Sequence, residues 1–134
     1  MFGSQSIVAS IDYKSEDQND IVYKSNGSIS TGIHLSKHVN FLNSLGFGEI
    51  LLNSIDRDGT GFGYDLEKVI SISDISTSPI IALGGAGNKD HFHAGLLVEN
   101  VAAVATANLF NFMGDALGIS RDYLLEKKIN LAKW

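Results

Sequence analysis

The fold is decided by two stretches, Glu49-Ile-Leu-Leu-Asn-Ser-Ile-Asp-Arg-Asp-Gly-Thr60 and Pro79-Ile-Ile-Ala-Leu-Gly-Gly-Ala-Gly87. Each is a short apolar run that ends abruptly in acidic, hydroxyl or glycine residues. In a parallel α/β sheet, such a run is typical of a strand that is buried on both faces. The residues that follow it lie at the carboxyl end of the strand, where α/β barrels place their binding and catalytic groups.

Outward from these stretches, apolar runs alternate with helical patterns along the whole chain. The expected strands are 6–12, 49–55, 80–83 and 101–106, and the expected helices are 35–45, 65–72, 90–97 and a last one capped by Ser120. This alternation implies parallel strands joined by right-handed helical crossovers. We therefore expect an α/β fold of four parallel βα units, half of a closed barrel, as a single (βα)4 domain over residues 1–134. The Asn26-Gly27 pair favours positive φ and predicts a small β-hairpin excursion after the first strand.

Composition excludes several classes of protein. The 134 residues carry a net charge of −5 and no basic run, so binding to nucleic acid has little support. Disulfides and thiolate metal sites are excluded because the chain has no cysteine. No signal peptide pattern follows Met1, and no apolar run approaches the roughly 20 residues of a membrane span. We expect a soluble cytoplasmic protein with no membrane partner.

Asp12 is the strongest catalytic candidate. It stands at the end of the first expected strand, where an unpaired buried charge costs several kcal/mol. Such a position favours a functional carboxylate, and we interpret Asp12 as a general acid or base. The alternative is an aspartate that caps or braces a loop.

The glycine-rich turn Gly84-Gly85-Ala86-Gly87 directly precedes an expected helix. Successive amide groups and the helix dipole together favour an anion, and phosphate in particular. Ala107 and Asn108 follow the next expected strand, a position where barrels often hold phosphate. The turn fits neither a Walker loop nor the dinucleotide fingerprint. Its alternative interpretation is a turn required only for packing.

The loop Asp56–Glu67 half-matches the spacing of a calcium loop, but a strand rather than a helix precedes it. A ligand-binding loop, or an ordinary acidic surface loop, fits that context better. His34 and His38 lie four residues apart, as in some metal sites, but no third ligand is evident. His91 and His93 are expected on the surface. We predict no metal site.

Several short segments recur together at characteristic separations. They are Phe2-Gly3-Ser4-Gln5, Ser10-Ile11-Asp12, Asn26-Gly27, Thr31-Gly32, Gly48 to Leu52, Ile55 to Thr60, Gly63-Tyr64-Asp65, Gly84 to Gly87, His91-Phe92 and Phe110. This set closely resembles the carboxyl-terminal half of the cyclase subunit of imidazole glycerol phosphate synthase. The resemblance runs from Phe2 to about Phe112 and covers most of the chain.

That family is a TIM (β/α)8 barrel built from two similar halves. Ammonia from a partner glutaminase passes through the barrel to a phosphorylated ribulosyl-imidazole precursor. The resemblance implies a lyase (cyclase) of histidine biosynthesis that acts on a phosphorylated small molecule and needs no cofactor. It implies that Asp12 is one of two catalytic aspartates and that Glu49 matches a charged residue of the ammonia gate. The positions that match one substrate phosphate site are Asp58, Gly59, Gly85, Ala107 and Asn108, and Gly84 adjoins them.

The chain also departs from the family pattern. Leu83 replaces a usual serine, Asn53 a common threonine and Asn108 another usual serine, and the tail from Gly114 to Trp134 differs. These departures keep two alternatives open. One is a homologue that works with a glutaminase-like partner in the amidation of surface sugars. The other is a non-catalytic phosphate-binding assembly module.

Half a barrel leaves two sheet edges without a partner strand and an apolar inner face exposed to water. Both features favour association with another chain. We therefore expect the chain to pair with a second copy or with a missing amino-terminal half. Alone, it is expected to be inactive or weakly active.

Overall fold

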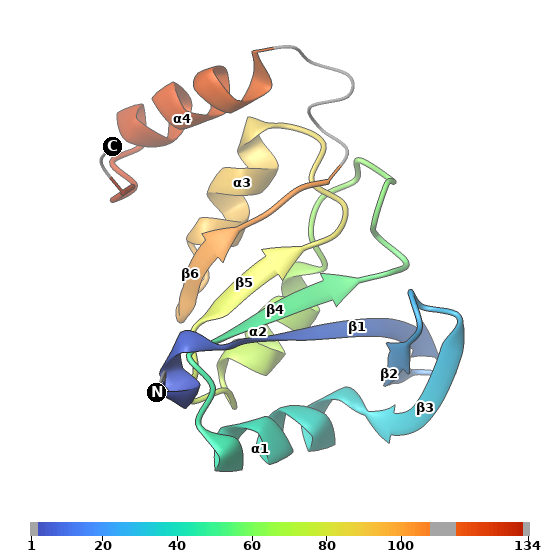
Figure 1. Ribbon diagram of the computed structural model, residues 1–134. Coiled ribbons are helices and arrows are strands. Elements are labelled where there is room, and N and C mark those ends of the chain that lie inside the picture. The colour runs from blue at the N-terminus through green and yellow to red at the C-terminus, as the bar shows by residue number, and fades with distance from the viewer. Residues whose placement is uncertain (1–2, 108–114, 133–134) are drawn as a thin grey trace.

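The computed structural model describes residues 3–107 and 115–132 (Figure 1). In chain order its elements are the 3-10 helix η1 (Ser4–Ser6), β1 (Val8–Glu16), β2 (Asn19–Lys24), β3 (Ile29–His34), α1 (Leu35–Leu45), β4 (Glu49–Ser54), α2 (Leu66–Ser73), β5 (Ile80–Leu83), α3 (Lys89–Leu96), β6 (Val101–Val104) and α4 (Ala116–Glu126). The strands form one sheet in the order β3-β2-β1-β4-β5-β6. In the part of the sheet formed by β1, β4, β5 and β6, neighbouring strands are parallel. On the other side of β1, β2 pairs antiparallel with β1, and β3 pairs antiparallel with β2.

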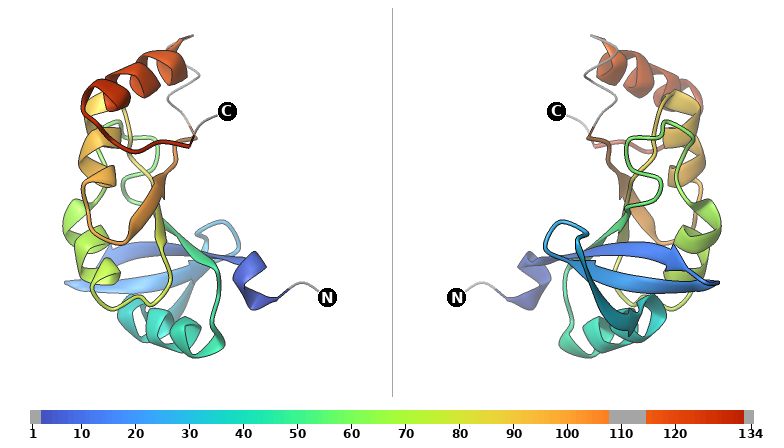
Figure 2. Two further views of the ribbon diagram at one scale, coloured as in Figure 1. Left: turned by 90° about the vertical axis from the view of Figure 1, so that its left-hand side faces the viewer. Right: turned by 90° about the vertical axis from the view of Figure 1, so that its right-hand side faces the viewer.

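The predicted half of a TIM barrel is confirmed by this arrangement. Four parallel strands, β1, β4, β5 and β6, each precede a helix in the chain, and β2–β3 is the predicted hairpin. The α-helices α1, α2 and α3 lie along one side of the curved sheet. The short 3-10 helix η1 lies toward the other side, which none of these three α-helices covers (Figure 2). In a closed barrel that bare side is the interior.

The strands show why only one face of the sheet carries the core. In β4, Ile50 and Leu52 are buried on the helix-covered face, while Leu51 and Asn53, which alternate with them along the strand, are half-buried on the bare face. The same alternation puts Ile80 and Ala82 of β5 into the core. On the bare face Val8 is 47% exposed, so apolar side chains meet water there.

The first strand is longer than predicted. It does not end at Asp12 but continues to Glu16, because residues 12–16 pair with β2 after the chain turns back at Asp17 and Gln18. Only the first part of β1, Val8–Ile11, has no partner strand on the side opposite β4 in the described sheet. The turn at Asn26-Gly27 is confirmed, and it connects β2 to β3.

The predicted cap of the last helix is wrong. Helix α4 begins at Ala116, and Ser120 lies inside it, buried at 3% exposure. The sequence pattern around a serine is similar whether it caps the start of a helix or is buried on the inner side of the helix. The start of the helix therefore depends on how its apolar side packs against α3, the element that it contacts most.

Core packing should dominate the stability of the isolated chain. Leu52 is 1% exposed, so Leu52→Ala should lower the free energy of unfolding by about 2–5 kcal/mol through lost transfer energy and a residual cavity. The matched control is Leu125→Ala on α4, where the side chain is 50% exposed. We expect a loss there below about 1 kcal/mol. Urea unfolding followed by circular dichroism measures both, and equal losses would contradict this description of the core.

Candidate functional site

A row of three residues crosses the bare face of the sheet at the carboxyl ends of its parallel strands. Asp12 in β1 stands opposite Asn53 in β4, and Asn53 stands opposite Leu83 in β5. The three therefore share one face and one end of the sheet, as the sequence predicted for Asp12 and the glycine turn that follows Leu83.

Asp12 is held in this row by a hydrogen bond from its neighbour. The Nδ2 atom of Asn53 donates over 2.9 Å to Oδ1 of Asp12. Asp12 is half-buried, so its carboxylate is neither sealed in the core nor free in solvent. A half-buried carboxylate with a fixed orientation suits proton transfer to a bound molecule.

The loop after β4 packs directly on the glycine turn after β5. The amide of Gly63 donates to the carbonyl oxygen of Gly85 over 2.7 Å. A Cβ atom at Gly85 would lie 2.3 Å from the Gly63 carbonyl oxygen, and one at Gly87 would lie 2.4 Å from that of Gly61. The two backbones are thus too close for side chains, which explains the glycines on both segments.

His91 contributes more than its expected surface position suggested. The amide of Gly87 donates to Nδ1 of His91 over 3.1 Å, and His91 is half-buried against Gly63. Nearby, Oδ1 of Asn88 accepts from the amides of Asp90 and His91 at the start of α3. The backbone amides of Gly87, Asp90 and His91 are therefore already hydrogen-bonded. An anion bound at the glycine turn must use backbone amides that precede Gly87. The sequence prediction named no cap for this helix, although asparagine is among the residues preferred directly before a helix.

Tyr64 joins the loop after β4 to the end of β6. Its hydroxyl donates to the carbonyl oxygen of Ala105 over 2.9 Å, two residues before Ala107. Burial raises the pKa of Tyr64 above its ordinary value, so the hydroxyl remains a donor across the physiological range. The three segments that follow β4, β5 and β6 are therefore fixed to one another.

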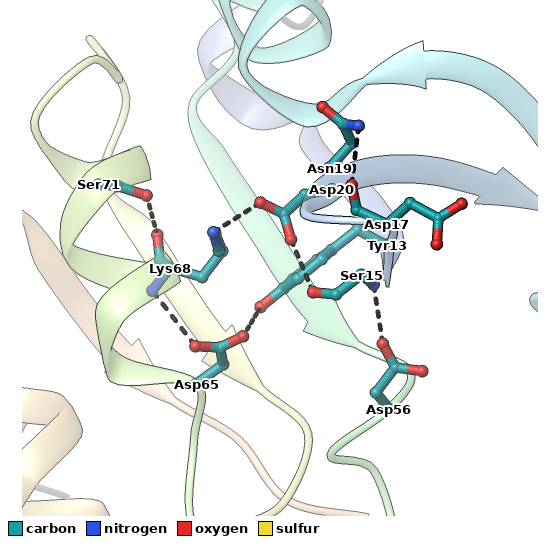
Figure 3. A network of polar contacts seen from close by, with 9 residues as sticks. All are labelled: Tyr13, Ser15, Asp17, Asn19, Asp20, Asp56, Asp65, Lys68 and Ser71. Atoms are coloured by element: carbon teal, nitrogen blue, oxygen red, sulfur yellow. Dashed lines mark hydrogen bonds and ion pairs between the residues drawn. The ribbon is translucent and has the colours of Figure 1, made fainter.

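A polar network on the helix-covered side anchors the same loop to the hairpin (Figure 3). The amide of Ser15 donates to Asp56 over 2.8 Å, and the hydroxyl of Ser15 donates to Asp20 over 2.7 Å. Asp20 in turn forms an ion pair of 2.7 Å with Lys68 of α2, and this hydrogen-bonded carboxylate raises the pKa of Lys68. Through Asp56 and Lys68, the network ties the extended end of β1 and the adjacent β2 to the start of the loop after β4 and to α2.

The other predicted site residues occupy two ends of the sheet. Asp58 and Gly59 lie in an exposed turn after β4, and Ala107 lies in an exposed bend after β6. Gly84 and Gly85 are buried directly after β5, and Asn108 lies outside the described residues. Glu49 begins β4 and stands opposite Val8, four residues before Asn53 or about 13 Å along the strand. Glu49 is thus at the opposite end of the sheet from Asp12, as its predicted gate role requires.

Residues 3–107 and 115–132 contain no group of three or more histidine, cysteine, aspartate or glutamate side chains placed to hold a metal. The half-match to a calcium loop at Asp56 follows a strand, as the sequence indicated. His34 ends β3 instead of standing on a helix with His38, so the two do not share a helix face. No described helix has both the length and the apolar content needed to cross a bilayer.

Comparison with known proteins gives consistent results. Residues 1–115 match the family model described as histidine biosynthesis protein. A Parasynechococcus marenigrum protein, provisionally named imidazole glycerol phosphate synthase subunit hisF2, is 44% identical over 100% of this chain and 50% of its own length. The HisF subunits of imidazole glycerol phosphate synthase from Thermotoga sp. and Lachnoclostridium phytofermentans are 42% and 41% identical, each over 97% of this chain and 51% of their own. The chain thus spans about half the length of the curated relatives that it matches.

Proposed function

Because this chain belongs to the histidine biosynthesis protein family, we propose that it supplies the carboxyl-terminal half of a cyclase barrel that forms imidazole glycerol phosphate. The observation that carries the proposal is the row of Asp12, Asn53 and Leu83, which opens onto the glycine turn at one end of the sheet. This placement brings the carboxylate of Asp12 and the backbone amides of the glycine turn to the same rim, which supports the proposed binding of a phosphorylated substrate.

In the proposed reaction, Asp12 transfers protons at the bound precursor. Its half-buried carboxylate faces the bare side of the sheet, where the interior of a completed barrel would enclose the substrate. Backbone amides near Gly84 and Gly85, with Asp58, Gly59, Ala107 and Asn108, form one phosphate site. Positive φ at Gly84 and Gly85, both 97°, turns that segment sharply after β5. Such a turn can direct successive amides toward one anion.

Ammonia would enter from the other end of the barrel. Glu49 lies at the amino end of β4, on the same face of the strand as Asn53. A glutaminase bound at that end would deliver ammonia past Glu49 toward Asp12. This arrangement separates the source of ammonia from the phosphate site, so the two partners do not compete for one surface.

The proposed enzyme needs a second half-barrel. The chain exposes a bare inner face and the edge Val8–Ile11 of β1, and unpaired edges and apolar faces favour association. The remaining wall of the substrate site would come from that second half. We propose that the complementary amino-terminal half, rather than a second copy, gives the active assembly.

The test combines this chain with the part of the Parasynechococcus marenigrum relative that it does not match. We expect the mixture to coelute and to form imidazole glycerol phosphate from the phosphorylated precursor and free ammonium, whereas the chain alone shows little turnover. Val8→Lys on the bare face should weaken association more than tenfold, about 1.4 kcal/mol or more. The matched control is Ile70→Lys on α2, because Val8 and Ile70 are both 47% exposed.

Three outcomes would contradict the proposal. A compact monomer at micromolar concentration that ignores the added half would exclude assembly. Coelution without turnover would exclude the cyclase reaction for this pair. Protection against unfolding by inorganic phosphate, without turnover in any mixture, would instead support a binding module.

A further inference from the structure

We propose that Asn53 is a positioning residue for Asp12 and that its amide serves both protonation states of that carboxyl group. The inference deepens the proposed function and rests on it, since Asp12 is the proposed acid/base group. It assigns to Asn53 a role in proton transfer although Asn53 itself exchanges no proton.

The contact between the two side chains has a defined polarity. Nδ2 of Asn53 donates to Oδ1 of Asp12 over 2.9 Å, which suits an ionised carboxylate because such a group only accepts. The two residues are register partners on adjacent parallel strands, so the backbone holds the pair together.

The other end of the amide has an unusual environment. Oδ1 of Asn53 is buried and has no hydrogen-bond partner among the described residues. A buried acceptor without a donor costs on the order of 1–3 kcal/mol. The observed orientation is therefore favoured by the bond to Oδ1 of Asp12, and a proton on that oxygen would favour the opposite orientation of the amide.

A rotated amide would suit the protonated state. The space beside Oδ1 lies near Gly84, where an added Cβ atom would lie 3.1 Å from Oδ1 of Asn53 and 2.5 Å from the carbonyl oxygen of Ser54. After rotation by 180°, Nδ2 would occupy this space beside Gly84. Oδ1 would then accept the proton of a neutral Asp12. An asparagine amide has both a donor and an acceptor, so one side chain can support both states of the cycle.

Substitutions at Asn53 test the role in the completed barrel. Asn53→Leu has a similar size but neither donor nor acceptor, and it should lower kcat about a hundredfold with little change in KM. Asn53→Thr, whose hydroxyl both donates and accepts, should recover most of that loss. Asn53→Asp places a second carboxylate beside Asp12, so the acid limb of the pH–kcat profile should move to higher pH. Wild-type kcat and an unchanged profile in both Asn53→Leu and Asn53→Asp would overturn the proposal.

A second measurement needs only this chain. We expect acidification to move the side-chain amide NMR signals of Asn53 in the wild type and to leave them in place in Asp12→Ala. Asn43 is the matched control because its Nδ2 donates to the backbone carbonyl oxygen of Ile75 over 2.8 Å, so its signals should not respond in either protein. Identical behaviour of Asn53 with and without Asp12 would overturn the inference. If no mixture turns over, the proposed function fails, yet this NMR result still decides whether Asn53 and Asp12 are coupled.

Discussion

Asp12→Asn should lower kcat of the completed barrel by about 10²–10⁴-fold, the range expected when a positioned general acid or base is removed. Asparagine keeps the size of the side chain and can still contact Asn53, but it cannot take up or release the proton. The phosphate groups bind elsewhere on the rim, so KM for the precursor should change much less than kcat. Steady-state kinetics with free ammonium measures both parameters.

The control for this substitution is Asp17→Asn. Asp17 is exposed in the turn between β1 and β2, where its φ of 45° is one that asparagine adopts readily. The same chemical change there should leave turnover within about twofold of the wild type, since surface substitutions alter stability by only about 0.5 kcal/mol. Wild-type kcat in Asp12→Asn, with the fold intact by circular dichroism, would exclude the acid/base assignment.

Gly85→Ala should cause a large loss of stability, about 2–4 kcal/mol, because two effects add. The φ of Gly85 is 97°, which disfavours any side chain, and the new Cβ would lie 2.3 Å from the carbonyl oxygen of Gly63. The neighbouring atom is backbone, so it cannot rotate away. The loop after β4 must move, and that movement should also reduce protection by inorganic phosphate.

Gly118→Ala is the matched control for the glycine turn. Gly118 lies within α4, and a Cβ there would meet nothing within 4 Å. Alanine is the better helix former, so this change should stabilise the chain by about 0.5–1 kcal/mol. Urea unfolding compares the two variants. A loss below about 1 kcal/mol in Gly85→Ala would show that the two loops are not packed as described.

The parallel strands were predictable because their apolar runs end in polar or glycine residues at a regular spacing. Ile50 to Leu52 and Ile80 to Leu83 have this pattern, and once the strands are parallel their carboxyl ends must share an edge. That rule alone brings Asp12 and the glycine turn to one rim. The register that puts Asp12, Asn53 and Leu83 in one row was not predicted, because parallel direction alone does not fix which residues stand opposite one another.

Other features depend on tertiary partners and were not predictable from local pattern. Residues 13–16 include Lys14 and Glu16, which are typical of a loop, yet they continue β1 because β2 pairs with them. Ser120 has the chemistry of a cap but faces the interior of the molecule. The acceptor role of His91 depends on the path of Gly87 across the sheet end, which no periodicity reveals.

The hairpin beside β1 limits how any joining chain can align. It occupies the edge of β1 from Asp12 onward, so an incoming strand finds only Val8–Ile11 open and meets β2 if it slides further. Side chains along a strand alternate between the two faces of the sheet, so a shift of the strand by one residue would turn every inward side chain outward. In the proposed assembly, the hairpin would therefore prevent an incoming strand from shifting along β1, and so favour one alignment of the two halves and one depth of the substrate chamber.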